Sequence, residues 1–252
     1  MFIAANWPVP AAQAGAVQTT RYGGYSLPPY ASLNLGDHVG DAIAHVQHNR
    51  KLVQTQLNLA LPLQTVHQVH GHQVIRLDQP VGTTHKPEAD ALYTRVRQLP
   101  LCMLTADCLP IFLIDRYGHE IAIIHGGWRS LAQGIIAHTL ACFDSAPKDM
   151  LVYMGAAIGA KQFVVGEEVR QVFTAQNTAL GLAFTAQHDT ATAHTVSKYF
   201  ADIYAIATMM LHAQGITQIY RHDYCTLSDA DLFFSYRREQ TTGRMGSIIW
   251  LP

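Results

Sequence analysis

The sequence predicts an α/β protein with a mixed β-sheet core and flanking helices. Three observations predict it: apolar runs of strand length at 111–115 and 120–125, helical periodicity at 42–58 and 197–215, and the alternation of the two kinds of segment. With 252 residues, 49% hydrophobic and 14% charged, the chain can bury a sizeable core. It contains no flexible linker and no internal repeat, so we expect a single domain over residues 1–252.

The N-terminal half begins with a loop and a helix. Residues 20–40 are rich in Gly, Pro, Tyr and Asn, which favours irregular structure. The segment 42–58 carries apolar residues at helical spacing and is predicted to be a helix. A strand interrupted near Gly71 is expected over 65–78, and two short buried strands over 99–115 flank a break at TADC.

The C-terminal half alternates helices and strands. Its clearest helix covers 197–215 and ends at Gly215, as a glycine C-cap predicts. The other predicted segments are, in order, a helix at 127–143, a strand at 149–159, a helix at 167–176, a strand at 216–223, and a strand, polar loop and strand over 232–252.

Charge and composition argue against several classes of partner. The net charge of −1 gives no overall attraction to nucleic acid or an anionic membrane, and no apolar run is long enough to span a bilayer. The first residues lack the basic and apolar regions of a secretory signal. The cysteines are widely spaced and form no CxxC, so we expect free thiols in a reducing, cytoplasmic compartment.

Three histidines, His67, His70 and His72, fall within the stretch HQVHGHQV. Side chains three residues apart in a strand point to opposite faces, so His67 and His70 cannot both face one metal ion. His72 can share a face with His70, but Gly71 interrupts the strand between them. We therefore expect one ligand, His70, and two bystanders.

Two further candidates for metal ligation stand at the ends of predicted elements. Cys108 lies just before Pro110 opens a buried strand, and His125 ends another strand before a Gly-Gly pair. Zinc and copper prefer nitrogen and sulfur ligands, and a catalytic site takes three of them and leaves one position open to activate water. The same residues also fit hydrogen-bonded strand-end histidines and a small buried cysteine, and spacing does not decide between the two.

Other polar residues lie close to these candidates in the sequence. Asp107 is placed to orient a ligand, act as a base, hold a substrate hydroxyl or cap a loop. Arg129 lies in the first turn of a predicted helix, where a bound anion or simple solvation would account for a cation. Arg237 and Arg238 alternate along a predicted strand, so at most one faces a pocket. Cys225 is either an activated nucleophile or an inert buried thiol.

Seven motifs together carry a family resemblance. They are SLNLGDHVGD with NR at 49–50, QVHG, ADALYT, TADCLPIFLID, IAIIHGGWRSLAQGI, AAIG with VGEEV, and CTLSDADLFFSYRREQTTGR. With these motifs the chain resembles the YfiH-type family of multi-copper polyphenol oxidoreductases, or laccases. That family is similar to the purine nucleoside phosphorylase domain of a human macrophage immunometabolic enzyme. The motifs cover nearly the whole chain in the expected order.

The resemblance implies a layered α/β sandwich with a catalytic Zn²⁺ held by His70, Cys108 and His125. It also implies that Asp107, Asn34 and Arg50 serve as catalytic or substrate contacts. The implied reaction is phosphorolysis of adenosine- or inosine-type purine nucleosides to the base and ribose 1-phosphate, with adenosine deamination as a second activity. The expected partners are the nucleoside and phosphate, with neither nucleic acid nor membrane among them.

Three alternatives stay open. The family name implies oxidation of phenols by Cu²⁺, although electron transfer through several coppers needs more histidine ligands than one triad supplies. Cys108 or Cys225 is also a candidate nucleophile for a thiol hydrolase that edits cell-wall precursors. The last alternative is a metal-carrying binding protein without turnover. No motif specifies the preferred nucleoside or the oligomeric state.

Overall fold

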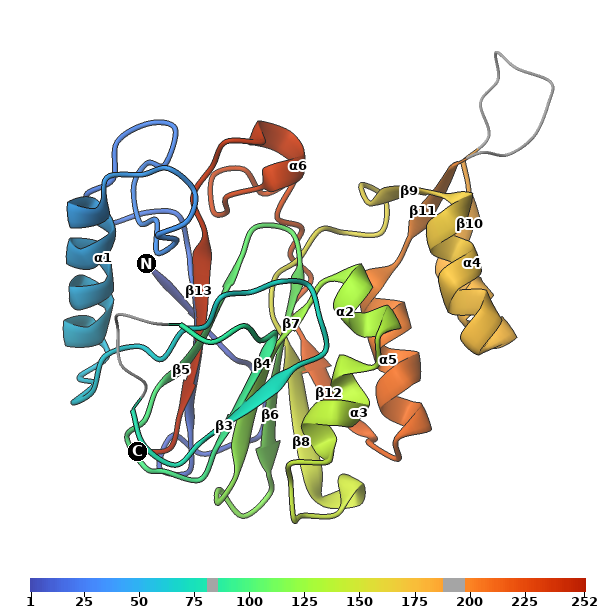
Figure 1. Cartoon of the computed structure of the whole chain (residues 1–252), viewed down its shortest axis with the longest axis horizontal. Helices are drawn as coiled ribbons and strands as arrows, with labels where there is room; N and C mark the ends of the chain where they lie inside the picture. The colour runs from blue at the N-terminus through green and yellow to red at the C-terminus, as the bar shows by residue number, and fades with distance from the viewer. Residues whose placement is uncertain (81–85, 188–197) are drawn as a thin grey trace.

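A computed structural model describes residues 1–80, 86–187 and 198–252, and its strands form three sheets (Figure 1). The largest has the order β12(Gln218–Arg221)–β8(Met150–Met154)–β6(Leu109–Asp115)–β7(Ile121–Gly126)–β4(Ala91–Thr94)–β3(Val74–Leu77). A second has the order β1(Phe2–Ala4)–β2(Gly15–Thr19)–β13(Met245–Trp250)–β5(Leu101–Thr105). The third has the order β10(Phe184–Ala186)–β11(Lys198–Ala201)–β9(Val164–Gly166). In the six-stranded sheet, β12–β8 and β3–β4 are parallel and the other pairs antiparallel, which confirms the predicted mixed sheet.

The two larger sheets stack face to face between layers of helix (Figure 1). Helix α1(Ile43–Gln56) covers the outer face of the four-stranded sheet. Helices α2(Trp128–Ala132), α3(Ile135–Leu140) and α5(Ile203–Ala213) cover the outer face of the six-stranded sheet. The three-stranded sheet and α4(Glu167–Gln176) project to one side of this body. The short helix α6(Tyr236–Glu239) and the 3₁₀ turns Pro147–Asp149 and Thr178–Ala183 complete the described elements.

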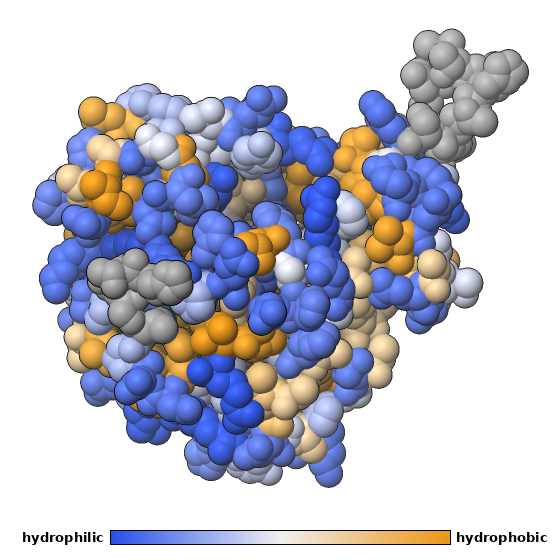
Figure 2. Space-filling view, in the orientation of Figure 1, coloured by the Kyte–Doolittle hydropathy of each residue, from blue (hydrophilic) through white to orange (hydrophobic). Residues whose placement is uncertain are grey.

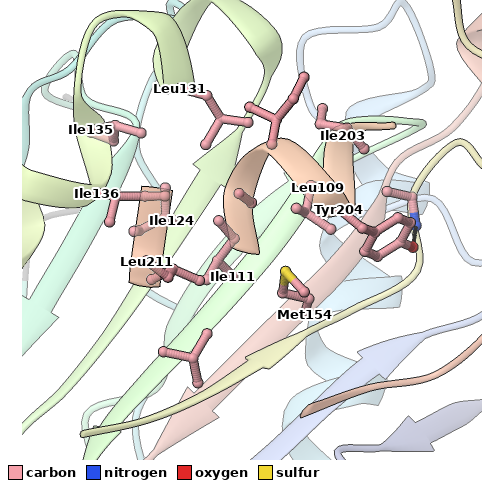
Figure 3. Close-up of a cluster of buried hydrophobic side chains, with 14 of the residues drawn as sticks. Leu109, Ile111, Ile124, Leu131, Ile135, Ile136, Met154, Ile203, Tyr204 and Leu211 are labelled. Carbon is pink, nitrogen blue, oxygen red and sulfur yellow. Dashed lines mark hydrogen bonds between the residues drawn. The ribbon is translucent and has the colours of Figure 1, made fainter. Parts of the chain in front are cut away.

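Strands β6 and β7 are buried on both faces because each face meets a different layer. Alternate side chains of β6 divide between two apolar clusters: Ile111 and Leu113 face the helices, whereas Phe112 and Ile114 face the other sheet. Figure 3 shows the helical side of this packing, with side chains of the sheet opposed to those of α2, α3 and α5 (Leu109, Ile111, Ile124, Leu131, Ile135, Ile136, Met154, Ile203, Tyr204 and Leu211). Hydrophilic residues cover most of the surface seen in Figure 2.

Two predicted helices are shorter or differently divided in the structure. The predicted helix at 197–215 is wrong in its first part, because residues 198–201 form β11 and pair with β9 and β10; Ser197 lies outside the described residues. The true start is set by Asp202, whose carboxylate accepts the N–H of Ala205. The predicted helix at 127–143 is split in two at Gly134, which has φ +81°.

Two predicted strands also differ from the structure. Only Val74–Leu77 of the segment 65–78 forms a regular strand, because the backbone N–H groups of residues 69–71 bind a side chain instead of a neighbouring strand. The strand predicted to begin at 232 is absent: residues 232–235 are irregular, and the helix α6 begins after Ser235, which caps it by accepting the N–H of Arg238. Arg237 and Arg238 therefore lie in a short helix and do not alternate across a strand as predicted.

Other expectations agree with the fold. The strands β5, β6, β7, β8, β12 and β13 and the helices α1 and α4 lie where the sequence predicts them. All four cysteines are free. Among the described residues, no helix combines the length and apolar character that crossing a membrane requires.

Candidate functional site

His70, Cys108 and His125 meet at one end of the six-stranded sheet. Each offers one ligand atom, and these atoms lie within 4.8 Å of one another, the one such group of three found in the described part of the chain. The Sγ of Cys108 is 3.9 Å from Nε2 of His70, and the rings of His70 and His125 are 4.7 Å apart. His125 is buried, whereas His70 is exposed, so the group is open on one side. Two nitrogens and one sulfur with an open side fit a zinc- or copper-type ion.

Asp90, just before β4, holds two of the three side chains in place. Its buried carboxylate accepts a hydrogen bond from Nδ1–H of His125 at 2.7 Å. It also accepts the backbone N–H groups of Val69, His70 and Gly71, at 3.2, 3.0 and 2.6 Å. A carboxylate only accepts, so Nδ1 of His125 carries a hydrogen, and Nε2 is the ring nitrogen that can bind a metal ion once the ion displaces its proton.

The charges of the group stabilise one another. Burial raises the pKa of the Cys108 thiol, but the positive charge of His125 and hydrogen bonds from both histidines outweigh it and lower that pKa to about 6. Burial lowers the pKa of His125, but Cys108 and Asp90 outweigh it and raise that pKa to about 9. Burial raises the pKa of Asp90 as well, and its hydrogen bond from His125 helps to bring it below its usual value. A thiolate is the form that binds a metal.

The backbone around the group has an unusual conformation at two positions and approaches the ligands closely at a third. His70 has φ +58° and Asp107 has φ +95°, conformations that cost a non-glycine residue free energy and concentrate at functional sites. Gly127 lies against the ligands: a Cβ there would lie 3.0 Å from Cδ2 of His70 and 3.4 Å from Sγ of Cys108. A side chain at residue 127 would therefore press on two of the three candidate ligands.

A cavity of about 230 Å³ opens beside the group. Its walls combine apolar and aromatic side chains with two arginines, alongside candidate ligands (His70, Ala106, Asp107, Cys108, Trp128, Arg129, Ile158, Phe163, Ile203, Tyr236 and Arg237). The guanidinium of Arg129 lies 4.4 Å from the Trp128 ring, and that of Arg237 donates to the carbonyl oxygen of Val164. Such a mixture of flat apolar walls and cations suits a ligand with an aromatic ring and an anionic group.

Asp107 lines the cavity, but its carboxylate is engaged by the protein. It accepts hydrogen bonds from the hydroxyls of Thr226 and Ser235, at 2.6 and 3.0 Å, and from the backbone N–H of Arg237 at 2.7 Å. The residue therefore ties the segment 226–237 to the start of β6, beside Cys108.

Asn34 and Arg50 do not line this cavity. The Asn34 side chain is buried; it donates to Gly36 and Asp41 and accepts the backbone N–H groups of Gly36 and Arg244. Arg50, on α1, donates to the carbonyl oxygen of Leu35 and pairs with Asp37 at 3.2 Å. Both side chains hold the loop between β2 and α1.

The remaining candidates from the sequence are placed apart from the group. The ring of His72 lies 4.7 Å from that of His138. The backbone of His67 makes hydrogen bonds with Pro87 and Ala89. Arg238 donates to the carbonyl oxygens of Thr226, Leu227 and Phe233 rather than to the cavity. Cys225 lines a separate cavity, where its sulfur accepts the N–H of Gly159.

Sequence reasoning missed Asp90. The residue precedes a buried strand, a position that many acidic residues occupy, and it lies 20 residues from His70 and 35 from His125. The sequence feature that could have indicated it is the pair Ala89-Asp90, which opens the ADALYT motif just before β4. Gly127 was easier to recognise from the sequence, because a Gly-Gly pair after a buried strand indicates that the backbone there approaches other groups closely.

Comparison with known proteins gives consistent relatives. The chain is 42% identical over 250 residues to "purine nucleoside phosphorylase YfiH" of Shigella flexneri, covering 99% of this chain and 98% of that protein. A crystal structure of a Neisseria meningitidis protein matches with a TM-score of 0.91 at 38% identity, covering 99% and 98% of the two chains. A Bacillus licheniformis hypothetical protein YfiH matches with a TM-score of 0.86 at 32% identity, covering 95% and 93%.

A family model described as "multi-copper polyphenol oxidoreductase laccase" matches residues 15–252. The match spans most of the chain and includes the segments that carry His70, Cys108 and His125. The resemblance seen in the motifs is thereby confirmed: the chain belongs to the multi-copper polyphenol oxidoreductase laccase family, whose YfiH members include proteins named purine nucleoside phosphorylases.

Proposed function

We propose that this protein is a zinc-dependent purine nucleoside phosphorylase acting on adenosine- and inosine-type nucleosides. In the proposed reaction the bond between C1′ of the ribose and the purine nitrogen breaks, and a bond from C1′ to a phosphate oxygen forms. The products are the free base and ribose 1-phosphate. His70, Cys108 and His125 hold the zinc ion in this proposal.

The observation that carries the proposal is the open His–Cys–His group at the wall of a cavity, in a chain 42% identical over its length to proteins named for this reaction. The cavity contributes aromatic surfaces of Trp128 and Phe163, which suit a purine ring, and the cations Arg129 and Arg237, which suit anionic oxygens.

Zinc bound at the group would supply a Lewis acid able to polarise an oxygen or activate water. The chain's own residues prepare that position. Asp90 fixes the tautomer of His125, and the imidazolium of His125 favours the thiolate of Cys108. Asp107, Asn34 and Arg50 stay predicted catalytic residues, and the hydrogen bonds of all three favour a role in positioning the loops around the site.

Copper-dependent oxidation of phenols is the main competing function. Among the described residues, the one group of three candidate ligands is too few for electron transfer through several coppers. Copper(II) binds nitrogen and sulfur ligands more tightly than zinc does, so this activity belongs among the tests.

The test incubates zinc-loaded protein with inosine or adenosine, with and without phosphate, and separates the products by chromatography. Cys108→Ala is the matched variant, and Cys142→Ala, at the end of α3 away from the group, is the control. We expect phosphate-dependent formation of base and ribose 1-phosphate by the wild type and by Cys142→Ala, and its loss in Cys108→Ala.

Each alternative predicts a different result. Conversion of adenosine to inosine without phosphate would make deamination the principal activity. Oxidation of a phenol by the copper-loaded protein alone would support the laccase reaction. Turnover of a substrate that continues after a chelator has removed the metal would indicate a thiol hydrolase. A protein that binds zinc but turns over none of these substrates would be a metal carrier.

A further inference from the structure

Arg244, immediately before β13, is a partly buried cation that does not line the cavity itself but lies behind Tyr236, a residue of its wall. Its backbone N–H donates to Oδ1 of Asn34 at 2.9 Å, and its Nη1 donates to the carbonyl oxygens of Thr242 and Gly243 at 2.9 and 3.1 Å. The guanidinium lies 5.8 Å from the ring of Tyr236, which lines the cavity together with Cys108. These contacts fix the position of a partly buried side chain.

The charge of Arg244 is not balanced by a carboxylate of the described chain. Neighbouring cations are paired: Arg50 and Lys86 share Asp37, and Arg238 pairs with Glu239. Within residues 1–80, 86–187 and 198–252, Arg244 takes part in no salt bridge, and only its Nη1 and backbone N–H donate hydrogen bonds.

Anionic groups of the candidate site act on the charge of Arg244. Burial lowers the pKa of Arg244, and the negative charges of Cys108 and Asp107 oppose that effect. Asp107 makes no hydrogen bond to Arg244 and instead accepts from Thr226, Ser235 and the backbone of Arg237. A partly buried cation without a partner costs free energy, and an anion bound during function removes that cost.

The free edge of the guanidinium indicates the shape of that anion. Nη1 is held by two carbonyl oxygens, which leaves Nε and Nη2 side by side without an acceptor in the described chain. This pair of donors matches two oxygens of a phosphate or sulfate group. Arg129 and Arg237 are more exposed, and each already has a contact, with the Trp128 ring and with Val164 respectively.

We propose that Arg244 binds a tetrahedral oxyanion beside Cys108, and that in the reaction proposed above this ligand is inorganic phosphate. The identity of the anion rests on the proposed function, whereas the binding position does not. Asn34 acts here as a positioning residue, because its side-chain oxygen holds the backbone of Arg244. This arrangement gives a physical reason for a buried asparagine that is outside the cavity.

The test compares zinc-loaded wild type, Arg244→Gln and Arg244→Lys, with Arg116→Gln as a control on an exposed arginine in the turn between β6 and β7. Initial rates are measured over a matrix of inosine and phosphate concentrations. Loss of a two-donor contact to a charged ligand should raise the KM for phosphate about 10- to 100-fold in Arg244→Gln. The KM for inosine should stay within about twofold of the wild-type value. A rise in the KM values for both inosine and phosphate would instead indicate a general loss of structure. Arg244→Lys should recover part of the effect, and Arg116→Gln should match the wild type.

An unchanged KM for phosphate in Arg244→Gln, with normal zinc content, would overturn the inference and leave the proposed function standing. If Arg244→Gln does not fold, the uncharged Arg244→Met takes its place, and an unchanged KM for phosphate there overturns the inference equally. If the wild type shows no phosphorolysis, the proposed function fails, and isothermal titration then decides the oxyanion site by itself. Inorganic phosphate binding to wild type but not to the variant would support it. Equal binding of inorganic phosphate to the wild type and the variant, or no binding to either, would reject it.

Discussion

Replacing Asp90 with asparagine changes one atom of the site and tests how its ligands are held. The wild-type carboxylate accepts four hydrogen bonds, three from the backbone at residues 69–71 and one from His125. An asparagine keeps one acceptor oxygen and introduces an NH₂ donor. If that NH₂ faces His125, Nδ1 must accept, so the proton moves to Nε2 and blocks the atom that would bind zinc.

The size of the effect follows from these bonds. Losing a hydrogen bond to a buried charged group and leaving its donor unpaired costs about 1–3 kcal/mol of unfolding free energy. Loss of a carboxylate that orients a histidine ligand typically lowers metal affinity about 10- to 100-fold. Asp90→Asn should therefore lose both stability and zinc affinity.

The matched control is Asp115→Asn. Asp115 is also fully buried and accepts three backbone N–H bonds, from Tyr117, His119 and Glu120, in the turn between β6 and β7, at the other end of β7 from His125. Urea unfolding of the metal-free proteins should show a comparable loss in both variants. Competition with a chromophoric chelator should show weaker zinc binding in Asp90→Asn alone. Equal zinc affinity in the two variants would refute the assignment of Asp90 as the residue that orients the site.

Three further predictions concern the candidate ligands, Gly127 and the buried hydroxyl of Tyr204 on α5. In the metal-free protein, the Cys108 thiolate stops stabilising the fold as pH falls through about 6, where its lowered pKa lies, and the His125 imidazolium stops doing so as pH rises through about 9, where its raised pKa lies. The urea midpoint should therefore be highest between pH 6 and pH 9. A midpoint that rises or falls steadily across this range would contradict the prediction. The backbone of Gly127, at φ −65°, also suits alanine, but the Cβ of Gly127→Ala would press against His70. Zinc affinity measured by chelator competition should therefore fall about tenfold, and the urea midpoint of the metal-free protein should stay the same. An unchanged zinc affinity would contradict this prediction. Tyr204→Phe removes a buried hydroxyl that accepts one backbone N–H and donates to a carbonyl oxygen. Urea unfolding should show that the free energy of unfolding falls by about 1–3 kcal/mol, and a fall below about 0.5 kcal/mol would contradict this role of the hydroxyl.

The fold was predictable where local pattern and burial agree. Strands β6 and β7 are short apolar runs because both of their faces are covered, and helix α1 follows an apolar stripe. The prediction failed at residues 198–201, which have helix-compatible residues but pair with β9 and β10, strands that local periodicity does not reveal. It failed again at 236–239, where Ser235 caps a short helix whose N-terminal part binds Asp107, more than 100 residues away in sequence.

The grouping of the three candidate ligands was predictable from the sequence, whereas the residues that position them were not. His70, Cys108 and His125 stand at element ends, and motifs across the chain carried the resemblance that grouped them. Asp90 and Arg244 act through contacts that depend on the folded chain: one joins two ligand segments, and the other is oriented by Asn34, 210 residues away. Residue type and local spacing do not predict contacts between residues that are so far apart in the sequence.

The three candidate ligands come from separate parts of the chain: the loop before β3, the start of β6 and the end of β7. An ion bound there would work as a removable cross-link, joining segments that are far apart in the unfolded chain. Because it binds only the folded form, it would add about 2.7 kcal/mol of stability when the free metal is at 100 times its dissociation constant. Differences of that size alter how much of a protein survives proteolysis in a cell. The amount of this protein should therefore rise and fall with metal supply, even in cells that contain none of its substrate.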